Sequence, residues 1–140
     1  MAEELRIHPL DLESDVAIGI DLPLIGRTGS TFKLNYTTID QAVANAKNLL
    51  LTNRGERVML PTFGCSISDT LFENITQDTI SDLQQRIQDS FDYWLPYIFI
   101  NELNITANED LNKMYIKITI SLETNKFDTR SIELVVANNQ

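Results

Sequence analysis

Residues 114–123 read Met-Tyr-Ile-Lys-Ile-Thr-Ile-Ser-Leu-Glu, with an apolar residue at every second position from Met114 to Leu122. A period of two sends alternate side chains to opposite faces of a β-strand. One face of this strand is therefore expected to pack on a core while the other meets water. That pattern is typical of an antiparallel sheet covered on one side.

Two weaker strand patterns flank this one. Ile98–Ile105 also alternates, but its parity slips between Ile100 and Leu103, as a β-bulge would cause. Beyond a predicted turn at Thr124–Asp128, Ser131–Ala137 is expected to form the last strand. Because the turns between consecutive strands are short, the three strands are expected to form an antiparallel meander.

Upstream, a long helix is predicted from Ile39 to Asn53. Thr38 and Gln41 have the spacing of a capping box, in which each side chain satisfies a backbone N–H group at the start of the helix. Gly55 stands where a left-handed residue often closes a helix. The apolar residues of the segment recur at helical spacing: Ile39, Ala42, Val43, Ala46, Leu49 and Leu50.

A second long helix is expected to follow Thr76, whose hydroxyl is suited to an N-cap, and to end before Pro96. Its apolar stripe consists of Ile80, Leu83, Ile87, Phe91 and Trp94. The sequence therefore predicts an α+β fold, in which two main helices pack on a small antiparallel sheet.

The N-terminal part is less regular. Residues 18–24 and 32–36 each alternate briefly, which favours an additional N-terminal hairpin. Residues 1–17 show no sustained period and are interpreted as an arm. The expected organisation is this arm, a single α+β domain over residues 18–137, and a polar tail at residues 138–140.

The composition of the 140 residues, 43% hydrophobic and 22% charged, is that of a globular protein. A formal charge of −9 argues against binding to nucleic acid or to anionic membranes, which would need clustered Lys and Arg. With one cysteine, Cys65, and one histidine, His8, we expect no internal disulfide, no metal site and no cofactor. The chain shows neither a membrane-spanning run nor a signal peptide at its start, so assembly in the cytoplasm is expected.

A glycosidase is the enzymatic alternative, because two carboxylates across a cleft suffice for that chemistry. Phage lysozymes of one family carry a Glu, an Asp or Cys nine residues on, and a Thr six further. Glu56 and Cys65 have the first spacing, but the sixth residue beyond Cys65 is Leu71, and Thr70 is one position short. We therefore predict no catalytic residues and no enzymatic activity.

Three motifs between Leu50 and Glu73 carry a family resemblance: Leu-Leu-Thr-x-x-Gly-Glu-Arg, Pro-x-Phe-Gly and Leu-Phe-Glu. In this order they resemble the lysozyme-like baseplate wedge family of contractile-tailed phages. That family includes the sheath initiator and a baseplate component of type VI secretion. The resemblance covers roughly residues 18–105. The residues interpreted as its structural motif are Gly55, Glu56, Arg57, Pro61, Phe63 and Gly64.

The resemblance implies a structural role. Members of the family offer sheet edges and arms to the first sheath ring, and dock on a helical core bundle of the baseplate wedge through a Glu-Pro-Arg motif. Here that position reads Leu95-Pro96-Tyr97, which keeps only the proline. Trp94 and Tyr97 have the character of interface anchors, so a contact without the two charges is expected.

Two partner surfaces are therefore expected. One is the segment of Trp94, Pro96 and Tyr97 after the second long helix, called the corner below, and the other is a sheet edge. The strand Ser131–Ala137 is a candidate edge for strand addition, although it could equally serve only to complete the domain's own sheet. Within the motif, Arg57 is expected to brace Glu56 or Glu73, and Phe63 to lie in the core. The predicted partner-binding residues are Trp94, Pro96, Tyr97, Ser131, Ile132, Glu133, Leu134, Val135 and Val136.

The resulting hypothesis is a virion structural protein of the tail baseplate, assembled in the host cytoplasm. It would dock on other baseplate wedge proteins and initiate polymerisation of the tail sheath subunit. A lysozyme-like peptidoglycan hydrolase is the alternative. Neither nucleic acid nor a membrane is expected as a partner.

Overall fold

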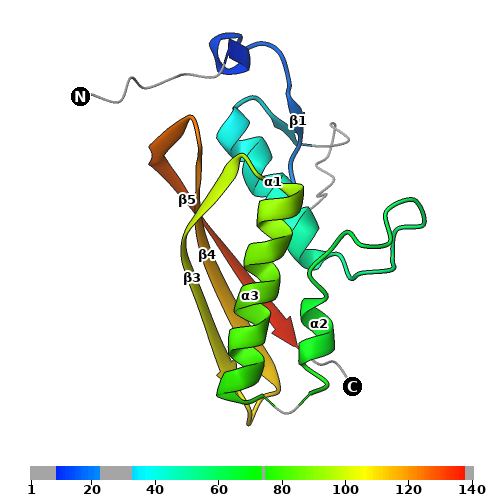
Figure 1. The fold of residues 1–140 in the computed structure, drawn as a ribbon. Helices are drawn as coiled ribbons and strands as arrows, with labels where there is room; N and C mark the ends of the chain where they lie inside the picture. Colours follow the sequence, from blue (N-terminus) through cyan, green and yellow to red (C-terminus); the bar gives the residue numbers. More distant parts are fainter. Residues whose placement is uncertain (1–8, 23–32, 74, 138–140) are drawn as a thin grey trace.

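The computed structural model describes residues 9–22, 33–73 and 75–137. Figure 1 shows helices on one side of a sheet, with the N-terminal elements at one end. The elements in chain order are the 3-10 helix η1 (Pro9–Leu12), β1 (Gly19–Ile20), β2 (Leu34–Asn35), α1 (Thr38–Leu51), α2 (Ile67–Thr70), α3 (Gln77–Trp94), β3 (Ile98–Asn108), β4 (Lys113–Leu122) and β5 (Asn125–Ala137). This arrangement confirms the predicted α+β fold with two main helices.

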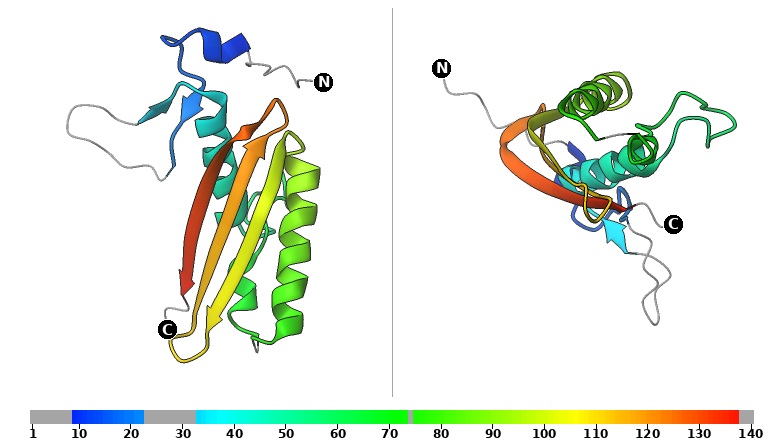
Figure 2. Two further views of the ribbon diagram at one scale, coloured as in Figure 1. Left: turned by 90° about the vertical axis from the view of Figure 1, so that its left-hand side faces the viewer. Right: turned by 90° about the horizontal axis from the view of Figure 1, so that it is seen from below.

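The larger sheet is antiparallel, in the order β3-β4-β5. The helices cover one of its faces, and the other face is open (Figure 2). The period of two in β4 is realised as predicted, because its alternate apolar side chains are buried under the helices. These side chains are Met114, Ile116, Ile118, Ile120 and Leu122.

Both long helices turn their apolar stripes toward this face. Leu49 and Leu50 of α1 and Leu83, Ile87 and Phe91 of α3 are almost fully buried. A fully buried side chain of this size stabilises a fold by about 1.5–3 kcal/mol relative to an exposed one. The core therefore lies between one sheet face and two helices, and the loops and sheet edges remain outside it.

The predicted bulge is present in β3, where the register shifts between Ile100 and Glu102. The predicted turn at residues 124–128 is wrong, because β5 already begins at Asn125. The carboxamide of Asn125 accepts hydrogen bonds from the backbone N–H groups of Phe127 and Asp128, at 3.2 and 3.3 Å. These two bonds lie at the start of β5, where the register of the β4–β5 pairing shifts between Ser121 and Leu122.

The cap of α1 also differs from the prediction. Thr37, not Thr38, is the N-cap, and its hydroxyl accepts from the backbone N–H of Asp40 at 3.3 Å. The backbone N–H and hydroxyl of Thr38 instead donate to Asp11, at 2.6 and 2.7 Å. The side chain of Gln41 donates to Asn45 and does not reach back to the cap.

The end of α1 was also predicted wrongly. The helix stops at Leu51, two residues before the predicted end at Asn53, and Thr52 is its C-cap. Gly55 does have a positive φ of 90°, but it lies in the following loop and does not close the helix.

The N-terminal hairpin is confirmed for its described residues, because β1 and β2 pair antiparallel. The carboxamide of Gln41 occupies the place that a Cβ at Gly19 would need, so this strand packs closely on α1. Residues 1–8, 23–32 and 138–140 lie outside the described part, and with them His8, half of the predicted arm and the polar tail.

Candidate assembly surfaces

Strand β5 forms one edge of the larger sheet. It pairs with β4 in nine consecutive residue pairs without a register shift, from Lys113–Ala137 to Ser121–Thr129. Of the predicted edge residues, Ser131, Glu133 and Val135 are exposed, and Ile132 is buried. Leu134 and Val136 are half-buried against the core.

Charged side chains border this edge. Glu133 pairs with Lys117 across the strands at 3.4 Å. Arg130 lies 2.6 Å from Asp128 and 3.9 Å from Asp40, and Asp40 belongs to the first turn of α1. Each of these pairs is solvent-exposed and contributes at most about 1 kcal/mol. The Arg130–Asp40 pair links β5 to α1, and Arg130 and Glu133 place charge on the edge strand.

The residues predicted to bind a partner after α3 differ in their surroundings. Trp94 is half-buried, with its ring 5.2 Å from Phe63 and 4.9 Å from Tyr93 in edge-to-face contacts. Tyr97 contacts a different element, since its hydroxyl accepts from Asn45 of α1 at 2.7 Å. Pro96 between them is exposed. Trp94 and Tyr97 therefore line two different hollows.

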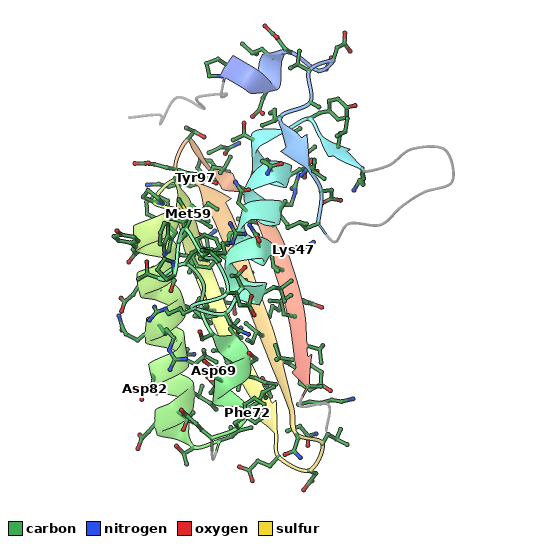
Figure 3. All side chains as sticks on the ribbon, turned by 90° about the vertical axis from the view of Figure 1, so that its right-hand side faces the viewer. Lys47, Met59, Asp69, Phe72, Asp82 and Tyr97 are labelled. Atoms are coloured by element: carbon green, nitrogen blue, oxygen red, sulfur yellow. The ribbon has the colours of Figure 1, made fainter. Side chains whose placement is uncertain are left out.

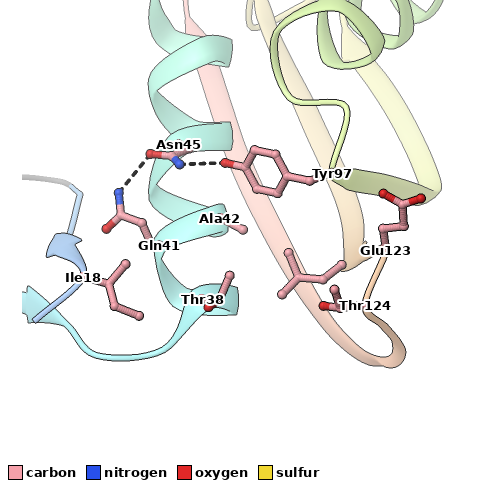
Figure 4. A pocket seen from close by; sticks show the side chains of 9 residues that line it. Ile18, Thr38, Gln41, Ala42, Asn45, Tyr97, Glu123 and Thr124 are labelled. Carbon is pink, nitrogen blue, oxygen red and sulfur yellow. Dashed lines mark hydrogen bonds between the residues drawn. The ribbon is translucent and has the colours of Figure 1, made fainter. Parts of the chain in front are cut away.

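Tyr97 lines a cavity of about 280 Å³ between α1, the β4–β5 turn and the N-terminal hairpin (Figure 4). The Tyr97–Asn45 hydrogen bond and the Gln41–Asn45 hydrogen bond run along one side of it. Its other lining residues are Ile18, Thr38, Ala42, Leu122, Glu123 and Thr124.

Trp94 lines a second hollow of about 410 Å³ between α3 and the loop that joins α1 to α2. Residues 52–66 are called the connector below. Arg54 and Thr62 of the connector form one wall of this hollow, and Asp89 and Tyr93 of α3 form the other.

The base of the connector needs unusual backbone geometry. Gly64 has a φ of 119°, and a Cβ there would overlap the carbonyl oxygen of Thr52. The N–H of Cys65 donates to that same carbonyl at 3.1 Å. Arg54 ties both sides of the loop together, because its backbone N–H donates to Ser66 and its guanidinium to the carbonyl of Gly64. Gly64 thus allows two backbone segments to approach closely.

The predicted brace of Arg57 to Glu56 or Glu73 is wrong. Its guanidinium donates to the carboxamide of Asn48 at 2.9 Å and stacks over Phe63 at 4.4 Å. Glu56 instead accepts from Asn53 at 3.0 Å. Arg57 still joins the connector to α1, but through a neutral amide and an aromatic ring.

The connector carries two side chains that belong to none of the predicted binding or motif residues. Val58 is 94% exposed and Met59 is 88% exposed. The connector projects from the body of the domain (Figure 1), and Met59 is labelled on it in Figure 3. A run of three apolar residues, Val-Met-Leu, between the loop residues Gly55 and Pro61 was the available signal, since it belongs to no helical or strand period.

The residues with lysozyme-like spacing do not form a nucleophilic site. Cys65 is fully buried, and desolvation raises the pKa of its thiol to about 11, so it is protonated at neutral pH. Thr70 is also buried, whereas Glu56 is exposed. Within residues 9–22, 33–73 and 75–137, no group of three His, Cys, Asp or Glu side chains is placed to hold a metal ion. No helix in this described part has the length and apolar character to cross a membrane.

Comparison with known proteins gives consistent matches. The sequence model of a family described as baseplate wedge protein gp25 matches residues 38–126. Baseplate wedge protein gp25 of Enterobacteria phage T4 is 30% identical over 90 residues, which span 64% of this chain and 68% of that protein.

Two solved structures share the fold. A proposed tail lysozyme from Geobacter sulfurreducens has a TM-score of 0.62 at 23% identity, over 74% of this chain and 95% of that one. A chain of the anti-feeding prophage baseplate has a TM-score of 0.63 at 23% identity, over 78% of this chain and 86% of that one.

Proposed function

The chain belongs to the family of baseplate wedge protein gp25, and from this premise we propose that it initiates the sheath of a contractile phage tail. It is a baseplate wedge protein and thus a component of the virion. The proposed action is templating: a rigid domain, held in the baseplate, presents the edge of β5 to the first ring of sheath subunits.

The observation that carries this proposal is the regularity of β5. Its nine unshifted pairs with β4 leave a straight row of backbone donors and acceptors on the outer side. The other edge strand, β3, is interrupted by the bulge between Ile100 and Glu102, and a bulge locally disrupts the row of backbone groups. A strand from a partner would therefore add more readily to β5.

Docking on the baseplate is assigned to two other features, the cavity lined by Tyr97 and the N-terminal arm. Tyr97 lines the 280 Å³ cavity, which can take one apolar side chain of a neighbouring wedge protein. In the arm, Leu12 and Val16 are exposed apolar residues, and Asp11 fixes this segment to the start of α1. Both features are suited to holding the protein while β5 stays available.

We further propose that the protein acts without catalysis. The cysteine at the lysozyme-like spacing is buried and protonated, and a thiol in that state cannot replace an ionised carboxylate. Purified protein is expected to leave peptidoglycan intact. Hydrolysis that is lost in Glu56→Gln would overturn this part of the proposal.

The strand-addition proposal is tested with proline at two successive edge positions. In an edge strand, consecutive N–H groups point alternately to the neighbouring strand and to the outside. One of the variants Leu134→Pro and Val135→Pro therefore removes only an outward donor. Circular dichroism and thermal melting identify the folded one, and Leu134→Ala and Val135→Ala serve as matched controls.

The folded proline variant is expected to enter baseplates but to leave them without sheath. Val135→Lys, which keeps every backbone donor, provides a second measurement of the same edge and is expected to slow sheath growth. Sheath of normal length and amount on baseplates carrying the folded proline variant would overturn the proposal.

A further inference from the structure

Val58 and Met59 are the most exposed of the large apolar side chains in the described part of the chain. Scattered exposed apolar residues need no explanation, but two adjacent ones at the tip of a projecting loop form a convex apolar surface. We name the pair Val58–Met59 the knob.

The knob sits on a braced loop. The N–H of Gly55 donates to the carbonyl of Pro61 at 2.8 Å, which closes the loop behind the knob. The N–H of Leu60 donates to Arg57 at 3.2 Å, and Arg57 itself is anchored on Asn48 and Phe63. Because both ends are tied down, little conformational freedom remains to be lost when the knob is covered.

Across the 410 Å³ hollow from the connector lies a polar and acidic surface on α3, since Asp89 lines that hollow together with Arg54 and Thr62. Asp78, Asp82, Asp89 and Asp92 recur at helical spacing, so they share its outward face. None of them belongs to an ion pair formed among the described residues. Figure 3 labels Asp82 on this helix. Tyr93, 75% exposed, ends the same face beside the 410 Å³ hollow that separates α3 from the connector.

We propose that the knob and the C-terminal half of this acidic face form a docking surface for another baseplate protein. This inference rests on the proposed function. The partner presents an apolar depression that receives Val58 and Met59, flanked by Lys or Arg side chains that face Asp89 and Asp92. Charge complementarity decides the occupant: a second copy of a chain with a formal charge of −9 would bring like charges to the contact.

Incorporation into baseplates tests the surface. The double variant Val58→Ser with Met59→Ser is expected to enter baseplates about tenfold less well, as for loss of central apolar anchors. Leu111→Ser removes an exposed leucine from the β3–β4 turn and serves as the matched control, with normal incorporation. All variants are first shown to melt within a few degrees of the wild type. Normal incorporation of the folded double variant would overturn the proposal.

The charge of the partner is tested separately. Asp89→Lys combined with Asp92→Lys is expected to reduce incorporation, whereas Glu109→Lys combined with Asp110→Lys, in the exposed β3–β4 turn, leaves it unchanged. Equal incorporation of the two variants would contradict the basic character assigned to the partner.

The identity of the partner is read by a photo-crosslinking amino acid placed at Met59 in assembled baseplates. An adduct with another baseplate protein supports the proposal. An adduct with a second copy of this chain, an adduct with the sheath subunit, or no adduct at all overturns it. The readout also separates this inference from the proposed function, because loss of the knob lowers the amount of the protein in the baseplate, whereas loss of the β5 edge leaves that amount unchanged but without sheath.

Discussion

The rings of Phe63 and Trp94 meet edge to face, with their centroids 5.2 Å apart. This contact joins the connector to the C-terminal end of α3, and the guanidinium of Arg57 lies over the same Phe63 ring, 4.4 Å from its centroid. The family motif and the corner after α3 are therefore parts of one packed unit, although about thirty residues separate them in the sequence.

Removing the ring of Phe63 should destabilise this unit. Phe63→Ala is expected to lower the free energy of unfolding by about 3 kcal/mol, because a nearly buried aromatic side chain leaves a cavity. Phe127→Ala, at an exposed position of β5, is the control and should change it by less than about 0.5 kcal/mol. Urea denaturation measures both, and equal effects would contradict the packing described for Phe63.

The two glycines with positive φ should respond differently to alanine. Gly64→Ala is expected to cost about 2–3 kcal/mol, since the new Cβ would overlap the carbonyl of Thr52 in addition to the strained φ. Gly55→Ala should cost only about 1 kcal/mol, because nothing lies within 4 Å of its Cβ position. Thermal melting of both variants gives the comparison. A reversed order would be inconsistent with the close approach at Gly64.

Thr70 offers a stabilising substitution. Its hydroxyl is buried, and no hydrogen-bond partner for it is found in the described part of the chain. Thr70→Val keeps the shape of the side chain and should raise the free energy of unfolding by about 1 kcal/mol. Thr52→Val is the matched control and should lower it, because the Thr52 hydroxyl donates to the carbonyl of Asn48 at 2.6 Å. A gain in both variants would point to a general effect of valine.

Cys65 should make stability depend on alkaline pH. Burial raises the pKa of its thiol from 9.0 to about 11, while contacts with Ser90, Arg54 and Arg86 oppose the rise. Above pH 9 the unfolded chain loses this proton and the folded chain keeps it, so the free energy of unfolding falls. The stabilising effect is complete below pH 9 and is lost as pH rises through about 11.

The expected loss attributable to Cys65 is about 1–2 kcal/mol at pH 10. It is measured as the difference between pH 7 and pH 10 in urea denaturation, compared with Cys65→Ala. Tyr and Lys titrate in both proteins, so only the difference between the two profiles reports on the thiol. Parallel profiles would show that Cys65 ionises equally in both states.

Periodic patterns predicted the elements of this fold well. The alternation around Ile118 and the apolar stripe through Leu83 and Ile87 reflect burial on one face, and burial is what a periodic sequence encodes directly. The bulge in β3 was visible for the same reason, because it shifts that alternation by one residue.

The errors arose where a contact distant in sequence decides between local alternatives. Thr37 and Thr38 are both able to cap α1, and Asp11 decides the choice by accepting from Thr38. The sequence offers Arg57 two acidic partners, Glu56 and Glu73, yet its guanidinium donates to the carboxamide of Asn48.

The candidate surfaces could also be predicted only in part, because some of them depend on contacts between residues distant in sequence. The edge position of β5 could be expected from the order of the strands. The separation of Trp94 from Tyr97, and the exposure of Val58 and Met59, depend on how the connector folds back on α3. Sequence spacing does not contain that information.

The nine unshifted pairs between β4 and β5 also have a mechanical consequence. Backbone hydrogen bonds in an antiparallel pair run perpendicular to the strands, so a force along β5 shears them all at once and does not open them one by one. A strand added on the outer edge of β5 would be loaded in the same geometry. The pairing between β5 and such an added strand would therefore resist a force along the strand far better than a force that peels the strand away from one end.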